Sequence, residues 1–346
     1  MPLGARFVVS VLVFVLGVQV VSGQQSSSPK PSTDRMIHLN VVVTDSSGRR
    51  VGGLTQQDFT LLDNKNQRPL TSFVETKENE PPVQLLIVVD AVNTPYTAVG
   101  YQREQIEKYL RANEGHLTIA TNFAVLTDKG VQLYNHPSKD GMALSSALEH
   151  EEIGLRVNGR SEGFYGAEDR VTLSLNALRD IAAYEAKLPG RKLVAWVSPG
   201  WALLSGPRLD LDNNQEKQIF GNIVDFSTQL REARVTLDAV NSWGADESLL
   251  RALYYEDFLK GVSKPDQAQL GNLALQVLAA QSGGLVLNSS DVVGNLQKCV
   301  DDAGVSYDVS VPAAPTERHD EYHELSVRID KPGLTTRTRA GYYAQP

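Results

Sequence analysis

The chain has 346 residues, of which 41% are hydrophobic and 21% are charged. These values are typical of a globular protein and exclude a disordered chain or one built mainly of membrane-spanning segments. The formal net charge of −8, with no long basic stretch, argues against nucleic acid and anionic lipid as partners.

The N-terminus has the form of a secretion signal. Arg6 precedes an apolar stretch over residues 7–21, and Val21-Ser22-Gly23 offers a small-residue cleavage site. The apolar stretch is shorter than the roughly 20 residues that a spanning helix needs. We therefore expect a cleaved signal peptide over residues 1–23, no stable membrane insertion after cleavage, and a secreted or periplasmic protein. The polar residues 24–34 are expected to form a linker.

Residues 35–80 follow, and their pattern predicts an N-terminal β segment. Apolar and polar residues alternate from Ile37 to Val43, as in a strand with one buried face. Asp45-Ser46-Ser47-Gly48 provides a turn, and shorter extended pieces come after it.

Residues 81–303 change to a pattern in which strands alternate with helices. Leu85–Val89 is a continuous apolar run, as expected of a strand buried on both faces of a parallel sheet. The alternation predicts βαβ units and helices on both faces of that sheet. The expected helices are residues 100–111, 138–150 with Ser138 as N-cap, 167–188, 215–231, 246–260, 266–281 and 291–303. The other expected strands are residues 123–127, 131–134, 193–197, 235–240 and 285–287.

Residues 304–346 return to β-structure. Residues 305–311, 324–329 and 335–343 are expected strands with no helix between them. Because an isolated hairpin is marginal in water, these strands are expected to pack with residues 35–80. The predicted fold is therefore an α/β Rossmann-like domain inserted into a small β-sandwich formed by the two terminal segments.

Polar residues stand at the carboxyl ends of two expected strands. Asp90, Asn93 and Thr94 follow the first central strand, and Ser198 follows residues 193–197. Open α/β sheets bind ligands at these strand ends, and hard cations prefer such oxygen atoms. These four residues are the candidate binding site.

Five stretches carry a family resemblance: VVVTDSSGRRVGGLTQQDFTLLDN (41–64), LLIVVDAVNT (85–94), LPGRKLVAWVSPGW (188–201), QSGGLVLNSSDV (281–292) and YHELSVRIDKPGLTTRTRAGYYA (322–344). Together they resemble the acidobacterial VWFA-related domain family over nearly the whole mature chain. The resemblance implies a von Willebrand A-type Rossmann-like domain, secretion and no catalytic activity. It also implies protein–protein contact, often through a divalent ion.

The metal-adhesion motif D-x-S-x-S of such domains is altered here to Asp90-Ala-Val-Asn-Thr94. Asp90 and Thr94 match the motif, whereas Val92 replaces a serine and has no atom that binds a metal. Pro199 stands where the third loop of the family has an aspartate. One carboxylate is a poor match for a hard dication, so the site is expected to be degenerate and no cofactor is expected.

Three alternatives remain open at this site. Asp90 and Thr94 could still hold Mg²⁺, with Ser161 and Thr172 as the nearest hydroxyls for the second loop. Otherwise Asp90 and Thr94 hydrogen-bond the loop and cap the following helix, or the strand ends bind a polar ligand directly.

Enzymatic alternatives are weaker. Ser198 resembles the nucleophile of a G-x-S-x-G elbow, with His319 or His323 as the base. However, Trp196 replaces the first glycine, and Pro199 has no N–H for an oxyanion hole. The pair His319 and His323 has the spacing of a helical zinc site, but it leads into an alternating strand and is expected to be a solvated strand edge.

The remaining candidates concern single residues. Cys299 is the only cysteine, so no intramolecular disulfide forms; a buried thiol is expected, with an intermolecular bridge or a reactive thiol as the alternative. Trp196 is expected in the sheet core. Tyr96, Trp201 and Trp243 follow strand ends, where they either pack in loops or form a binding rim.

The sequence thus favours a secreted, non-enzymatic A-type domain that mediates protein–protein or surface interaction through Asp90, Asn93, Thr94 and Ser198. A metal-dependent adhesion module is the main alternative, and a cell-envelope serine hydrolase is a more distant one.

Overall fold

The computed structural model describes residues 36–76, 83–134, 136–151, 163–201, 211–242 and 254–345. These residues all belong to the unit that runs from Met36 to Pro346. The expected signal peptide and the expected linker lie outside the described residues.

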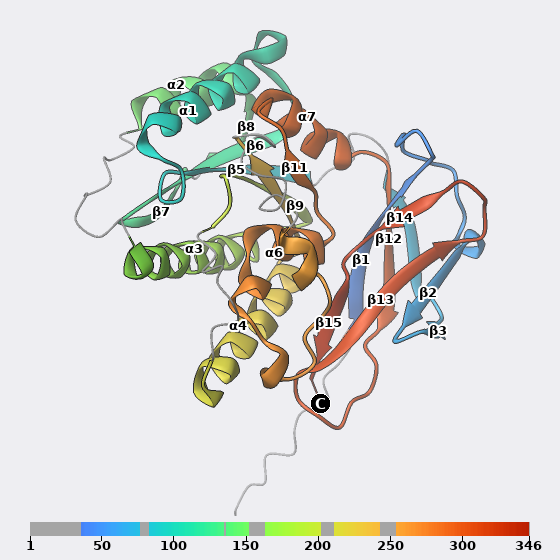
Figure 1. Ribbon diagram of the computed structural model, residues 1–346. Helices are drawn as coiled ribbons and strands as arrows, with labels where there is room; N and C mark the ends of the chain where they lie inside the picture. Colours follow the sequence, from blue (N-terminus) through green and yellow to red (C-terminus); the bar gives the residue numbers. More distant parts are fainter. Residues whose placement is uncertain are drawn as a thin grey trace, which may run out of the picture. The chain divides into compact units, whose positions relative to one another are not determined.

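Among the described residues, a seven-stranded sheet forms the centre of the α/β region (Figure 1). Its strands are β5 (Val83–Asp90), β6 (His116–Thr127), β7 (Gly130–Leu133), β8 (Ser138–Asp140), β9 (Arg191–Val197), β10 (Val235–Asn241) and β11 (Val286–Asn288). The spatial order is β11-β10-β9-β5-β6-β7, with β8 paired to β6. All neighbours from β11 to β6 are parallel, and β7 and β8 are antiparallel to β6. Counted along the chain without β8, this is the 3-2-1-4-5-6 order of a doubly wound sheet.

Helices cover both faces of this sheet (Figure 1). One face carries α1 (Tyr96–Arg111), α2 (Gly141–His150) and α7 (Val292–Asp302), and the other carries α3 (Gly163–Glu185), α4 (Asn213–Glu232) and α6 (Leu275–Ser282). Successive side chains of a strand point to opposite faces of the sheet. Leu85, Ile87 and Val89 of β5 therefore pack in the core under α1, α2 and α7, whereas Leu86 and Val88 pack in the core under α3, α4 and α6. None of the helices in the described ranges is long and apolar enough to cross a membrane.

The two terminal segments form two sheets that share one core (Figure 1). Within the described residues, the sheet orders are β14-β1-β12-β4 and β15-β13-β2-β3. The strands are β1 (Met36–Thr44), β2 (Phe59–Asp63), β3 (Asn66–Arg68), β4 (Ser72–Thr76), β12 (Ser306–Pro312), β13 (Glu321–Ile329), β14 (Thr335–Arg337) and β15 (Gly341–Ala344), with a short 3₁₀ turn η1 (Gln56–Asp58). The pairs β1–β12 and β2–β13 join strands that precede the α/β region to strands that follow it.

The predicted fold class is confirmed: a Rossmann-like α/β sheet with helices on both faces, plus a small β-sandwich built from the terminal segments. The continuous apolar run of β5 is buried from both sides, as its pattern predicts. The alternating residues Ile37, Leu39, Val41 and Val43 of β1 all face the sandwich core.

The start of α2 differs from the prediction. Ser138 was the expected N-cap, but Ser138–Asp140 forms the short strand β8, so that prediction is wrong. Asp140 is the N-cap instead, and its carboxylate accepts a hydrogen bond from the backbone N of Ala143 at 3.0 Å. Aspartate and serine satisfy the same free N–H groups at a helix start, so the pattern did not separate them.

The long helix expected over residues 266–281 is also wrong. The segment holds two 3₁₀ turns, η4 (Pro265–Gln267) and η5 (Leu270–Leu273), before the short helix α6. Ala268 and Ala274 are extended and interrupt the helical path. The side chain of Asn272 explains the break, because it accepts from Gln269 N at 2.9 Å and donates to Phe258 O at 3.3 Å. Phe258 belongs to a 3₁₀ turn, η3 (Tyr254–Phe258), so the described part of the expected helix 246–260 is not α-helical.

The last expected strand, residues 335–343, is divided between the two sheets of the sandwich as β14 and β15. Between them, Ala340 N donates to Gln281 O at 3.1 Å, which ties this crossing to the end of α6. The crossing places Arg339 in a buried position beside the α/β region.

Candidate functional site

The predicted site lies where the strand order of the sheet reverses. β5 and β9 are parallel neighbours, with Val89 opposite Val197, so Asp90 and Ser198 follow adjacent strand ends. The chain continues from β5 toward β6 on one side and later returns as β9 on the other. Ligands of doubly wound sheets bind outside the carboxyl ends at such a switch point. The predicted residues therefore lie together at the carboxyl edge of the sheet, at its switch point.

Asp90 is fully buried, and four N–H groups donate to its carboxylate. Oδ1 accepts from the backbone N of Val92 and of Asn93, both at 2.9 Å. Oδ2 accepts from Asn93 Nδ2 at 2.8 Å and from the indole Nε1 of Trp196 at 2.9 Å. Because a carboxylate offers about four lone-pair positions, this group is saturated by protein donors.

Trp196 reaches Asp90 from the neighbouring strand β9. Its side chain is fully buried and packs edge-to-face on Trp201, with ring centroids 5.2 Å apart. The sequence predicted Trp196 as a core residue, which is correct, but did not reveal its hydrogen bond to Asp90. An indole donates and does not accept, so this position supplies a neutral donor where a metal site needs an oxygen ligand.

Asn93 extends the network from β5 to helix α3. Its Nδ2 also donates to Ser174 Oγ at 2.8 Å, and Ser174 Oγ donates to Arg170 O at 2.8 Å. Ser174 was not singled out from the sequence, although the candidate Thr172 lies two residues away on the same helix. Asp90 therefore links β5, β9 and α3 through hydrogen bonds.

Thr94 does not act as a cap. α1 begins at Tyr96 with Pro95 at the N-cap position and no side-chain cap bond, so the capping prediction for Thr94 is wrong. The Thr94 hydroxyl is buried and has no hydrogen-bond partner in the described part of the chain. The predicted loop hydrogen bonds of Asp90 are present.

Ser198 is buried as well, and its Oγ accepts a hydrogen bond from Gly200 N at 3.2 Å. The histidines proposed as its base are elsewhere: His319 lies in the loop before β13 and His323 lies on that strand. His323 Nδ1 contacts Asp63 Oδ1 at 2.6 Å. Nothing in these contacts prepares Ser198 as a nucleophile.

His323 also corrects the prediction of a solvated strand edge. Its side chain is buried, stacks on Tyr342 with ring centroids 5.0 Å apart, and shares Asp63 with the Tyr342 hydroxyl, which donates to Oδ2 at 3.0 Å. His319 is exposed, as predicted, and contacts Gln345. The two histidines do not converge on one metal, because one lies inside the sandwich and the other at its surface.

Cys299 is buried on α7, in the core between α7 and the sheet. Burial raises the pKa of its thiol well above the ordinary value, and the neighbouring Asp238 carboxyl raises it further. Burial also raises the pKa of Asp238 to about 7. A thiol kept protonated in this way is a weak nucleophile.

The residues at the strand ends do not fit a divalent ion. The single carboxylate is occupied by N–H donors, Val92 packs into the apolar core, and Pro199 offers no side-chain ligand. Among the described residues, the buried oxygens without partners at this edge include Asn93 Oδ1, Thr94 Oγ1 and Gln102 Oε1, and all three are neutral. Within the described ranges, no three His, Cys, Asp or Glu side chains are grouped as a metal site would require.

The predicted contact surface is not exposed. Asp90, Thr94 and Ser198 are buried and Asn93 is partly buried, so these side chains do not themselves present a face to a partner. Trp201, an expected rim residue, is buried against Trp196. The side chain of Tyr96, together with Trp243 and Ser161, lies outside what the structure describes.

Comparisons with known proteins give structural similarity only. No protein-family model matches the chain, and no curated protein matches it. The human COPII-coat protein Sec24c is similar at 12% identity and a TM-score of 0.35, over 79% of this chain and 46% of that one. The SpRpn10 VWA domain is similar at 13% identity and a TM-score of 0.30, over 62% and 93%. Manganese-loaded Plasmodium vivax TRAP protein is similar at 9% identity and a TM-score of 0.33, over 79% and 98%. This chain therefore spans less than half of the Sec24c chain.

Proposed function

We propose that this chain is a secreted, non-enzymatic protein that mediates protein–protein or surface interaction, and that the metal-adhesion site of its A-type domain is degenerate. The proposal follows the motif resemblance and the N-terminal secretion signal. Its main support is the Asp90 carboxylate, whose four N–H partners leave no position for a cation.

The chemistry of these partners explains why the Asp90 carboxylate needs no cation. In a metal site a dication balances the charge of the carboxylate. Here hydrogen bonds stabilise the charged group instead, and each contributes roughly 1.5–3 kcal/mol to stability. The donors come from the loop after β5 and from β9, so the network fixes the geometry of the strand ends. Asp90 is then a structural residue, and a partner would contact the surrounding loops.

Isothermal titration calorimetry with MgCl₂ and MnCl₂ tests the degenerate site. We expect no saturable heat at millimolar metal with the natural sequence, and the same trace with Asp90→Asn. Circular dichroism shows whether the variant is folded, and Thr94→Val serves as a second variant that keeps Asp90. Saturable binding that Asp90→Asn abolishes would establish the alternative, a metal-dependent adhesion module.

A pull-down from the native envelope fraction tests the interaction. The tagged full chain is used in parallel with EDTA and with Mg²⁺. We expect the same specific partner to be captured in both conditions. Capture in Mg²⁺ alone supports metal-dependent adhesion, and the absence of any partner that survives competition by untagged chain contradicts an interaction function.

A further inference from the structure

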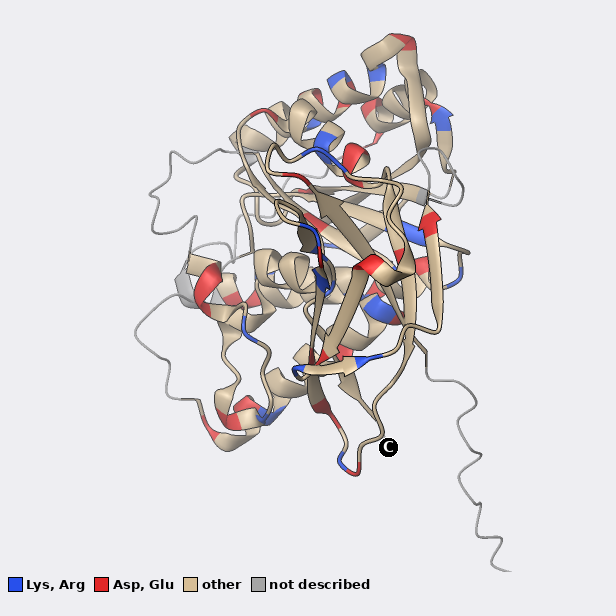
Figure 2. Ribbon diagram, turned by 90° about the vertical axis from the view of Figure 1, so that its right-hand side faces the viewer, with Lys and Arg blue, Asp and Glu red and all other residues tan. Residues whose placement is uncertain are grey.

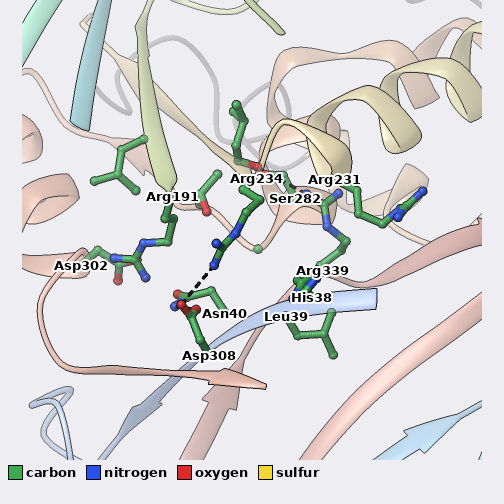
Figure 3. Close-up of a pocket in the computed structure, with 14 residues that line it drawn as sticks. His38, Leu39, Asn40, Arg191, Arg231, Arg234, Ser282, Asp302, Asp308 and Arg339 are labelled. Atoms are coloured by element: carbon green, nitrogen blue, oxygen red, sulfur yellow. Dashed lines mark hydrogen bonds and ion pairs between the residues drawn. The ribbon is translucent and has the colours of Figure 1, made fainter. Parts of the chain in front are cut away.

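A second polar site lies at the opposite, amino end of the central sheet, where β9 and β10 begin. It is an open pocket of about 570 Å³, including its solvent-filled mouth, between these strand starts and the sandwich strands β1 and β12. Arg191 opens β9, Arg234 directly precedes β10, Arg231 comes from the end of α4, and Arg339 comes from the crossing between β14 and β15. Figure 3 shows Arg191 beside Asp302, Arg234 in contact with Asp308, and Arg231 and Arg339 on the side of His38.

Two of these arginines are buried without a carboxylate partner. Arg191 donates to Ser306 Oγ at 3.0 Å and to Ala303 O at 2.7 Å. Arg339 donates to Val235 O at 3.3 Å and to Ser227 O at 3.5 Å. In the described part of the chain, neither guanidinium has an acidic group within 4.0 Å, and their relative exposures are only 7% and 8%.

The two acidic residues of the pocket are already engaged. Asp308 pairs with Arg234 at 3.1 Å and accepts from Asn40 at 3.0 Å. Asp302 pairs with two arginines outside the pocket lining, Arg50 at 2.5 Å and Arg337. Arg231 pairs with Glu232, a neighbour outside the pocket lining, at 3.2 Å. The pocket lining holds four arginines and two carboxylates, which leaves an excess of positive charge.

Some N–H groups of the pocket arginines have hydrogen-bonding capacity left. The Nε atoms of Arg191 and Arg231 are buried and have no hydrogen-bond partner in the described residues. Burial, together with the nearby Arg231, lowers the pKa of Arg339 to about 9. An unpaired buried cation is costly, so a ligand that brings negative charge and acceptor atoms would stabilise the arrangement.

This charge is local to the pocket. Figure 2, which faces the sandwich side, shows Lys and Arg interspersed with Asp and Glu along the described part of the ribbon. A pocket with a few guanidinium groups in its lining suits a small anion rather than a long polyanion.

We propose that this pocket binds a small oxyanion of the phosphate or carboxylate type, held by Arg231, Arg339 and Arg191. Planar guanidinium groups bind such oxygens by paired, charge-assisted hydrogen bonds. The ligand would bridge the α/β region and the sandwich, because its partners come from both. This inference is independent of the proposed function, since it uses no residue of the Asp90 network.

Calorimetry and thermal unfolding with sodium phosphate, sodium sulfate and sodium acetate, each matched for ionic strength with NaCl, test the inference. We expect saturable binding of at least one anion, with Tm raised by about 5 °C at saturating ligand. Binding of phosphate or sulfate alone indicates a tetrahedral oxyanion, and binding of acetate as well indicates a carboxylate type. No saturable binding of any of the three overturns the inference.

Variants separate the pocket from general charge effects. Arg231→Gln should weaken anion binding about tenfold or more, and Arg231→Lys should weaken it less because the charge is kept but the planar group is lost. Arg318→Gln removes an exposed arginine in the loop before β13 and should leave binding unchanged. Arg231 is only partly buried, so its replacement is less disruptive than that of Arg339. Equal binding in folded Arg231→Gln and the natural sequence contradicts the assignment.

Discussion

The carboxyl and amino ends of the central sheet hold buried charge in opposite ways. At the carboxyl end, Asp90 is surrounded by four N–H donors, so its charge is satisfied within the protein. At the amino end, Arg191 and Arg339 donate to carbonyl and hydroxyl oxygens, and no carboxylate of the described residues lies within 4.0 Å of either guanidinium. A satisfied charge serves structure, whereas an unsatisfied one is where a ligand gains the most.

This difference between the two sheet ends is the opposite of what the metal-adhesion motif predicts. The strand-end motif directs attention to Asp90, yet four N–H groups already donate to its carboxylate. The arginine pocket belongs to no motif, but its groups have binding capacity left.

The largest effect is expected from Asp90→Ala. Four buried N–H groups lose their acceptor, so the free energy of unfolding should fall by about 4 kcal/mol. Urea denaturation measures this change, with Asp225→Ala, an exposed aspartate on α4, as the control. A loss equal to that of the control would mean that Asp90 is not a structural centre.

Asp238 is a second buried carboxyl, and it differs from Asp90 in its hydrogen bonds. It accepts one backbone hydrogen bond, from Leu285 N at 2.7 Å, whereas Asp90 accepts hydrogen bonds from four N–H groups. Its pKa is raised from 3.8 to about 7, so the folded protein holds a proton that the unfolded chain releases between these values. Its contribution to stability is therefore full below about pH 4 and is lost as pH rises to about 7, on the order of 4 kcal/mol.

Asp238→Asn should flatten this part of the pH dependence. Glu185, whose pKa burial raises to about 7, keeps a slope of the same sign in the variant. Urea denaturation across this pH window compares the two proteins. Identical pH profiles would show that Asp238 does not carry the effect.

Trp196→Phe keeps an aromatic ring and removes the indole donor to Asp90. We expect the free energy of unfolding to fall by about 2 kcal/mol, most of it from the lost hydrogen bond. Trp201→Phe is the matched control, because the Trp201 Nε1 has no partner in the described residues. If both variants lose the same stability, the Asp90–Trp196 hydrogen bond contributes nothing beyond packing.

The smallest effect is expected from Thr94→Val. The Thr94 hydroxyl is buried without a partner, so replacing it with a methyl group should leave stability unchanged or raise it by about 0.5 kcal/mol. Ser174→Ala, which removes a hydroxyl with two partners, should instead lower stability by about 1 kcal/mol. A clear loss with Thr94→Val would indicate a missing ligand at this hydroxyl.

The position of the strand-end site could be predicted from sequence, but its partners could not. The apolar run of β5 followed by Asp90 is a local pattern, and parallel strand ends meet at one edge. Trp196 and Ser174 lie 106 and 81 residues from the groups they contact, Asp90 and Asn93. No local periodicity reports such pairings.

The arginine pocket was beyond sequence reasoning for a related reason. None of its four arginines belongs to a motif. They line one pocket because the α/β domain is inserted between the strands of the sandwich. The break between β14 and β15 that delivers Arg339 was predicted as one continuous strand. A basic residue at the start of a fully buried strand, as in Arg191, was the available signal.

The NMR signal of the Trp196 indole N–H tests the central claim most directly. It is assigned by its loss in Trp196→Phe and followed while MnCl₂ is added, since paramagnetic Mn²⁺ broadens nearby protons. We expect this signal to exchange slowly with solvent and to keep its width, because the N–H points to Asp90 Oδ2. Selective broadening at low metal concentration, with loss of protection from exchange, would show that the carboxylate binds a cation and would contradict the account.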